Sequence, residues 1–291
     1  MAIDYAELKK GGFLKQKQSG NFIMRLRTVG GNLTAEQLAG VTELAKKYGR
    51  GYVHLTTRQG VEIPWVALEN FDGIRNDMKK LNLLPGTCGP RIRTVVSCPG
   101  TDVCGFALMD SQRAAATLDR TFFGREVPIK TKIGVSGCPN SCSKPQENDI
   151  GFKGAVEPAF NPEVCTGCGL CARICPAKAL KMVGDKPEID RSKCIHEGNC
   201  ISSCPADAWQ AARSGFHLYA GGKIGRFPQL GVKIAEFVPE EELVETVEKV
   251  LAGFRVLAQK GERIANVINR VGADVFRRTV FEQGEKTECA K

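Results

Sequence analysis

The sequence predicts an α+β fold in three parts, and three observations lead to this prediction. Residues 21–85 alternate strand-like and helix-like segments, residues 86–155 are rich in loops, and residues 156–213 contain seven of the thirteen cysteines. A chain of 291 residues is long enough for one large domain and a small one. We therefore expect an N-terminal domain over 1–85, a second domain over 86–155 and 214–291, and an inserted module over 156–213.

The first part has the pattern of half a ferredoxin-like sandwich. Thr34 is expected to cap a helix, because Gln37 can complete a capping box. The apolar positions of this helix recur at helical spacing, at Leu38, Val41, Leu44 and Ala45. Strands are expected over 22–27, 52–57 and 63–68, and a second helix over 71–81. The resulting β-α-β-β-α order is typical of ferredoxin-like folds.

The C-terminal part begins with a glycine-rich loop over 220–226, and Pro239 is expected to open a long helix. The apolar positions of that helix are Leu243, Val247, Val250, Leu251 and Phe254.

Composition narrows the possible partners. No apolar run approaches the roughly 20 residues of a membrane span, and the N-terminus lacks the plan of a secretory signal, so we expect a cytoplasmic protein without a membrane span. The net charge of +9 favours an anionic partner. Nucleic acid is the weakest candidate, because aromatic residues make up only 7% of the chain and no stacking motif is present. The odd number of cysteines favours metal ligation over disulfides.

The inserted module carries two ferredoxin-type cysteine runs. The first, Cys165-x2-Cys168-x2-Cys171-x3-Cys175-Pro, is the bacterial ferredoxin pattern, and the second is Cys194-x5-Cys200-x3-Cys204-Pro. The fourth cysteine of each run ligates the other cluster in such folds. We therefore predict one [4Fe–4S] cluster on Cys165, Cys168, Cys171 and Cys204, and a second cluster on Cys175, Cys194 and Cys200.

The second cluster lacks a fourth cysteine ligand. Glu197 occupies the corresponding place in the run, and a carboxylate oxygen can bind iron. The alternatives are a [3Fe–4S] cluster with Glu197 merely nearby, or a ligand from elsewhere such as Cys289. A zinc site is a weaker interpretation, because zinc ribbons use paired CxxC motifs.

Four further cysteines arrive in two pairs, Cys98-x5-Cys104 and Cys138-x3-Cys142. Four thiolates from two separated loops could bind one iron–sulfur cluster. The two cysteines of the second pair are so close in sequence that one of their sulfurs could face another metal centre.

These pairs belong to a set of motifs in which the chain resembles siroheme-dependent sulfite and nitrite reductases. The motifs are Arg25-Leu-Arg27-Thr-Val-Gly-Gly, Leu55-Thr-Thr-Arg58-Gln59-Gly, the two cysteine pairs, and Lys130-Thr-Lys132. The resemblance implies a [4Fe–4S] cluster on Cys98, Cys104, Cys138 and Cys142, with Cys142 bridging to the siroheme iron.

The resemblance also implies roles for the basic residues. Arg25, Arg93, Lys130 and Lys132 would bind the anionic substrate. Lys130 and Lys132 would point to the same face if they lie on a strand. Residues assigned to siroheme are Arg27, Arg58, Gln59, Asn140, Cys142, Gly221, Gly222, Lys223 and Arg226. Cys88 is interpreted as a packed thiol near Arg93, and the three histidines as structural.

The activity that the resemblance implies is six-electron reduction of sulfite to sulfide, fed through the insertion by an external low-potential donor. The insertion resembles that of dissimilatory and anaerobic sulfite reductases and so favours sulfite. Reduction of nitrite to ammonia is the alternative, followed by a non-catalytic siroheme electron-transfer subunit and a plain polyferredoxin. A single catalytic repeat further predicts a homo- or hetero-oligomer.

Overall fold

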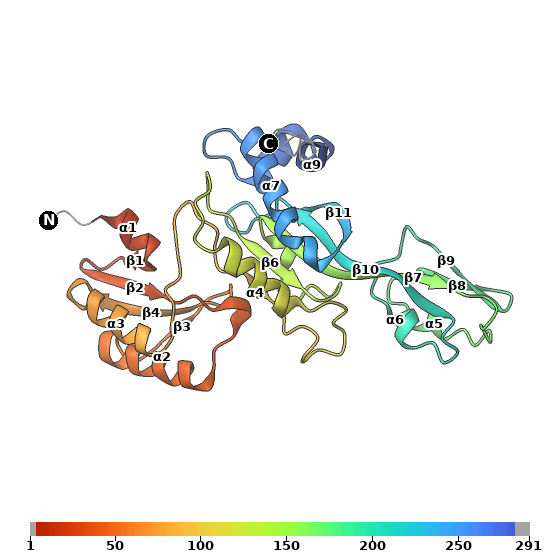
Figure 1. Ribbon diagram of the computed structural model, residues 1–291, viewed down its shortest axis with the longest axis horizontal. Helices are drawn as coiled ribbons and strands as arrows, with labels where there is room; N and C mark the ends of the chain where they lie inside the picture. Colours follow the sequence, from red (N-terminus) through yellow and green to blue (C-terminus); the bar gives the residue numbers. More distant parts are fainter. Residues whose placement is uncertain (1–3, 283–291) are drawn as a thin grey trace.

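A computed structural model of the chain describes residues 4–282 and arranges them in three sections along one long axis (Figure 1). At one end lies a four-stranded antiparallel sheet of order β1-β2-β4-β3. Its strands are β1 (Phe13–Lys15), β2 (Asn21–Arg25), β3 (His54–Leu55) and β4 (Val61–Ala67). The helices of this section are α1 (Tyr5–Lys10), α2 (Ala35–Tyr48) and α3 (Phe71–Lys80).

Helix α2 begins as the sequence predicts. The Thr34 hydroxyl accepts from the Gln37 N–H at 3.1 Å, and the Gln37 side chain accepts from the Thr34 N–H, which completes the capping box. Two details differ from prediction. Leu38 faces solvent at 52% exposure, and the strand expected over 52–57 is reduced to His54–Leu55, with Leu55 70% exposed. The other three predicted apolar positions of α2, Val41, Leu44 and Ala45, lie in the core of this section as expected.

The middle section is a five-stranded mixed sheet of order β11-β10-β7-β6-β5. Its strands are β5 (Val96–Ser97), β6 (Ile133–Ser136), β7 (Ile150–Phe160), β10 (Trp209–Ala220) and β11 (Val232–Val238), of which β5, β6 and β7 are mutually parallel. Its helices are α4 (Ser111–Phe122), α7 (Leu243–Leu257), α8 (Ile264–Val271) and α9 (Ala273–Glu282). The five predicted apolar positions of α7 are all buried in the core. The helix begins at Leu243 because Pro239 caps a short 3-10 turn over Glu240–Glu242.

The third section grows out of the middle sheet. Strands β7 and β10 pair from Ile150↔Ala220 to Phe160↔Trp209 and form a long ribbon that leaves the sheet (Figure 1). The expected boundaries at 155/156 and 213/214 therefore fall inside these strands. At the tip lie α5 (Leu170–Ile174), a hairpin of β8 (Leu180–Val183) and β9 (Lys186–Ile189), and α6 (Asn199–Ser202). A small core around Trp209, which is 2% exposed, holds the tip together.

Within residues 4–282, no helix combines the length and apolarity that crossing a membrane requires.

Candidate active site

A cavity of about 280 Å³ lies between the N-terminal sheet and the segment that leads into β6. All four residues predicted to bind substrate line it, namely Arg25, Arg93, Lys130 and Lys132. The two lysines precede β6 rather than lying within it, and they flank Thr131, which bridges to Ile92. The chain is extended around this bridge, and both lysines line the cavity. They therefore lie on one side of the chain although β6 begins only at Ile133.

Arg25 is fixed by a buried carboxylate. Its Nε donates to Glu62 Oε1 at 2.8 Å and its Nη2 lies 2.6 Å from the same oxygen, while Glu62 is only 6% exposed. Strands β2 and β4 pair Arg25 with Glu62 directly. The guanidinium is therefore held at the cavity by its neighbour in the sheet.

A second cavity, of about 320 Å³, adjoins the first and reaches Cys142. Thr57, Arg58 and Lys132 line both cavities, and Gln59 lines the second. Cys142, which is predicted to bridge to the haem iron, thus lines a cavity that shares Arg58 and Lys132 with the first one.

The two cysteine pairs come together where parallel strands end. Cys98 follows β5 and Cys138 follows β6, and these strands run side by side. Burial raises the pKa of the Cys138 thiol, and the charges of Cys98, Cys104 and Cys142 raise it further. The Gly137 N–H also donates to Cys98 Sγ at 3.2 Å. The arrangement suits a cluster that needs four thiolates and backbone donors to sulfur.

Among the residues described, no three His, Cys, Asp or Glu side chains are arranged to hold a single metal ion. A [4Fe–4S] cluster needs a different arrangement from a single ion. Its four cysteines bind four separate irons, so their sulfurs lie further apart.

Arg58 and Lys132 carry positive charge that no carboxylate within residues 4–282 neutralises by a direct ion pair. The Arg58 guanidinium donates to the Asn148 side chain, and to the Thr94 carbonyl at 3.1 Å. Burial lowers the pKa of Arg58 to about 10. Burial also lowers the pKa of Lys132 to about 8, with the charges of Arg58 and Arg263 adding to the effect. Half-buried cations without a carboxylate partner fit a polyanionic ligand such as siroheme.

The basic residues at the two cavities are held in place by further residues that the sequence analysis did not single out. Asp149, 1% exposed, accepts from the Lys132 N–H at 2.9 Å and from Arg263 at 2.7 Å. Arg263 is 114 residues away in the sequence, and no motif connects it to Asp149. The Asn-Asp pair before β7 is the only local signal.

Other predicted siroheme residues lie away from both cavities. Arg27 pairs with the fully buried Asp119 at 2.5 Å and stacks on Phe123. Lys223 lies in a hairpin with Gln229, Arg226 and Asn140 are exposed, and only the neighbouring Ile224 lines the second cavity. Gly222 permits a close approach, but to the chain's own backbone, since a Cβ there would lie 2.1 Å from the Gln146 carbonyl oxygen.

Five cysteines of the insertion, Cys171, Cys175, Cys194, Cys200 and Cys204, belong to the small core at the tip. Cys165, Cys168, Cys171 and Cys204 line one small cavity. Burial raises the pKa of Cys194, and the charges of Cys175 and Glu197 raise it further, so these side chains are neighbours. Cys200 lies beside Cys194, Cys171 and Cys175. Cys289 lies outside the described residues.

Comparison with known proteins decides the family. The profile "Nitrite and sulphite reductase 4Fe-4S domain" matches residues 88–288, and the profile "Nitrite/Sulfite reductase ferredoxin-like half domain" matches residues 14–81. The chain belongs to the nitrite and sulphite reductase family. Its architecture is thus a single ferredoxin-like half joined to the 4Fe-4S and siroheme domain of that family.

Relatives of this nitrite and sulphite reductase family member include proteins named sulfite reductases and proteins named nitrite reductases, such as the ferredoxin–nitrite reductase of Synechococcus elongatus, 35% identical over 50% of the chain and 28% of that relative. The coenzyme F420-dependent sulfite reductase of Methanocaldococcus jannaschii is 33% identical over 96% of the chain, which spans 45% of that relative's length. One component of the anaerobic sulfite reductase of Salmonella typhimurium is 27% identical, with 85% of this chain and 79% of the relative covered. An uncharacterized protein of M. jannaschii is 31% identical, with coverage of 90% and 91%.

Solved structures of the nitrite and sulphite reductase family share the fold. Dissimilatory sulfite reductase I superposes with a TM-score of 0.72 at 20% identity, over 89% of this chain and 69% of the other. The Mycobacterium tuberculosis NirA protein gives a TM-score of 0.70 at 20% identity, over 98% and 48%.

Proposed function

We propose that this chain reduces sulfite to sulfide at the basic cavity, with siroheme bound beside a [4Fe–4S] cluster on Cys98, Cys104, Cys138 and Cys142. The observation that carries this proposal is the convergence of four basic residues on a cavity that adjoins the one lined by Cys142. Siroheme and the cluster, when bound, would supply electrons at an iron centre open to substrate.

The chain's own residues would bind and protonate the substrate. Sulfite takes up six electrons and seven protons to give hydrosulfide and three waters, so the site must both neutralise an anion and deliver protons. Arg25 and Arg93 would orient the oxygens as permanent cations. Lys132, with its pKa lowered to about 8, is suited to donate protons near neutral pH.

Arg58 and Gln59 would contact siroheme from the second cavity. Gln59 also fixes strand β5 directly before Cys98, because its side chain exchanges hydrogen bonds of 2.5 and 3.0 Å with the Ser97 backbone. Lys223 and Arg226 would contribute only if their hairpin closes on the ligand.

The insertion would hold two further iron–sulfur clusters that pass electrons from an external donor. The proposed ligand sets are Cys165, Cys168, Cys171 and Cys204 for one cluster, and Cys175, Cys194 and Cys200 for the other, and the gathering of cysteines at the tip supports this proposal. Glu197 remains our proposed fourth ligand of the second cluster. Spectroscopy of anaerobically purified protein tests it: a [3Fe–4S] centre that added ferrous ion does not convert to [4Fe–4S] would rule the glutamate out.

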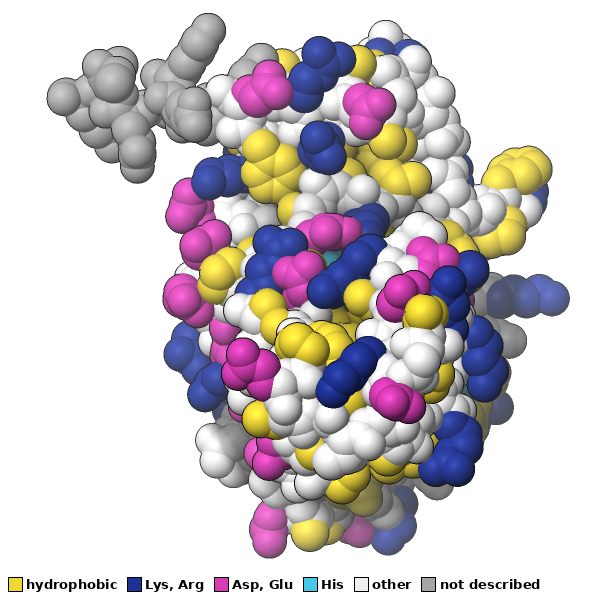
Figure 2. Space-filling view, turned by 90° about the vertical axis from the view of Figure 1, so that its right-hand side faces the viewer, with side chains coloured by type: hydrophobic (Ala, Val, Ile, Leu, Met, Phe, Trp, Pro, Cys, Tyr) yellow, Lys and Arg dark blue, Asp and Glu magenta, His cyan; other side chains and the backbone are white. Residues whose placement is uncertain are grey.

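Figure 2, which faces the insertion end, shows basic and acidic side chains interspersed. The insertion and its ribbon contain ion pairs such as Arg213–Glu157 at 2.6 Å and Lys193–Asp190 at 2.9 Å. We therefore expect a donor protein to dock here by shape and mixed charge rather than by a single strong charge.

The deciding experiment is an absorption spectrum combined with reduced methyl viologen assays on sulfite and nitrite in parallel. A Soret band with higher kcat/KM for sulfite is expected. Higher kcat/KM for nitrite would favour the alternative substrate, a Soret band without turnover would indicate an electron-transfer subunit, and no Soret band a polyferredoxin. Light scattering tests the proposed oligomer, which a monomer would contradict.

A further inference from the structure

Cys88 lies between two arginines of the proposed substrate site. Arg25 Nη1 donates to Cys88 Sγ at 2.8 Å, and Arg93 Nη1 donates to the same sulfur at 2.7 Å. Cys88 is 6% exposed and is not among the proposed cluster ligands. A free thiol packed in a core would need no such partners.

We propose that Cys88 is a positioning residue of the anion site, whose sulfur holds the guanidinium groups of Arg25 and Arg93 together at the cavity. This inference rests on the proposed function. Two guanidinium groups beside two lysines repel one another where solvent screens them poorly. A shared sulfur acceptor, together with Glu62 behind Arg25, offsets that repulsion before substrate arrives.

A second observation indicates that the cavity is arranged for a polar ligand. Thr87 is only 4% exposed, lines the cavity, and has a hydroxyl that finds no hydrogen-bond partner among residues 4–282. Arg93 Nε is buried and equally without a partner in this part of the chain. Buried polar atoms are normally satisfied, so both are available to the oxygens of a small oxyanion.

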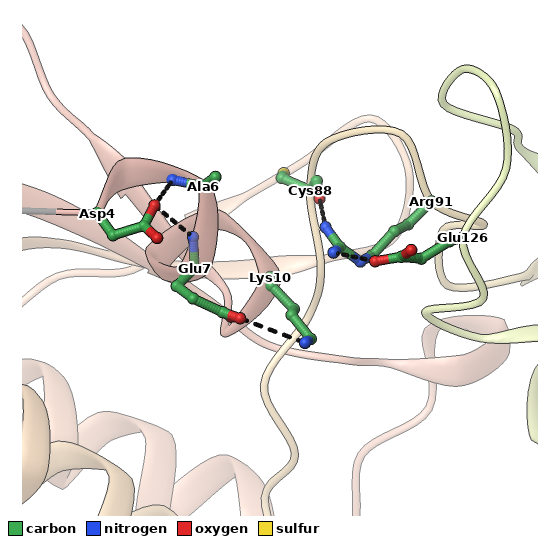
Figure 3. Close-up of polar contacts among 7 residues, drawn as sticks. All are labelled: Asp4, Ala6, Glu7, Lys10, Cys88, Arg91 and Glu126. Atoms are coloured by element: carbon green, nitrogen blue, oxygen red, sulfur yellow. Dashed lines mark hydrogen bonds and ion pairs between the residues drawn. The ribbon is translucent and has the colours of Figure 1, made fainter.

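The backbone of Cys88 is anchored independently of its sulfur. Its N–H donates to the Lys9 carbonyl at the end of α1 at 2.9 Å, and its carbonyl accepts from Arg91 Nη1 at 3.5 Å. Figure 3 shows the Cys88 loop beside α1, with Arg91 turned to Glu126, 2.7 Å away. Substituting the side chain therefore removes the sulfur contacts and leaves these anchors in place.

The test compares Cys88→Ala and Cys88→Ser holoenzymes with wild type and with Val267→Ala. The control removes buried atoms from the C-terminal core, outside the cavity. Sulfite binding is followed by the shift of the Soret band, and KM and kcat are measured separately. For Cys88→Ala we expect Kd and KM for sulfite to rise about 10-fold, the effect of losing charged hydrogen bonds, with kcat within about 2-fold.

Cys88→Ser is the conservative rescue, because a hydroxyl oxygen accepts the same two donors. Its Kd should lie within about 3-fold of wild type. The inference is overturned if Cys88→Ala binds sulfite like wild type, or if Cys88→Ser loses as much affinity as Cys88→Ala. If Cys88→Ala fails to fold, Cys88→Ser decides alone, and a 10-fold loss overturns the inference. Failure of the proposed function would appear in wild type itself, as absent sulfite reduction.

Discussion

Arg263 Nη2 donates to both carboxylate oxygens of Asp149 at 2.7 Å, and its Nε donates to one of them at 3.0 Å. The same carboxylate accepts from the backbone of Lys132. One buried ion pair thus connects the start of α8 to the segment that carries the two cavity lysines.

Replacing Arg263 by leucine should destabilise the protein by about 3–5 kcal/mol, because it leaves the buried Asp149 charge without its partner. Urea unfolding of the holoprotein measures the change. Arg270→Leu is the matched control, since it breaks the more exposed pair with Glu262 at 2.7 Å, which solvent screens, and should destabilise the protein far less. Equal losses in the two variants would contradict the assigned role of Asp149.

Sulfite binding should weaken as the pH rises through about 8, because the lowered pKa of Lys132 means that its positive charge is lost there rather than near its usual value of 10.5. Spectral titration with sulfite from pH 6 to 10 measures this. Lys132→Arg keeps its charge throughout, so its affinity should stay level above pH 8. A decline of the same size in Lys132→Arg would show that another group is responsible.

Arg58→Gln should lower siroheme content more than Arg27→Gln does. Arg58 lines both cavities without a carboxylate partner among the described residues, whereas Arg27 is held by Asp119. Extraction and quantification of siroheme from the two purified variants gives the comparison. Arg27→Gln should instead lower thermal stability, because it leaves the Asp119 carboxylate buried and unpaired. The opposite ranking of siroheme content would return Arg27 to the siroheme site.

Cys168→Ala should remove one cluster of the insertion while the Soret band remains. Iron content is expected to fall by up to four per chain, and turnover with a reduced ferredoxin should slow at least about 10-fold. Cys138→Ala provides the contrast, since it should perturb the haem spectrum as well. An unchanged rate with ferredoxin in Cys168→Ala would argue against electron entry through the insertion.

The sequence predicted correctly those elements that are stabilised by contacts within their own segment. The Thr34–Gln37 capping box closes within four residues, and the apolar stripe of α7 follows from helical spacing alone. The cysteine spacings predicted which thiols would share a cluster, because ligand spacing within a loop is a local property, and those groupings stay predictions. Leu38 was expected on the apolar face of its helix but is exposed, because burial depends on what packs opposite, and no segment among residues 4–282 covers it.

The sequence by itself determined the family, because its motifs lie in contiguous segments, and it predicted the cysteine groups and the four cations of the proposed site. Only the tertiary structure decided how those cations are balanced. Glu62 faces Arg25 across a sheet, Asp149 meets Arg263 from the far end of the chain, and Cys88 joins Arg25 to Arg93. Such pairings depend on distances between segments far apart in sequence. A buried charge has lost its contact with water and needs a partner within the protein, and only the fold decides which residue that partner is.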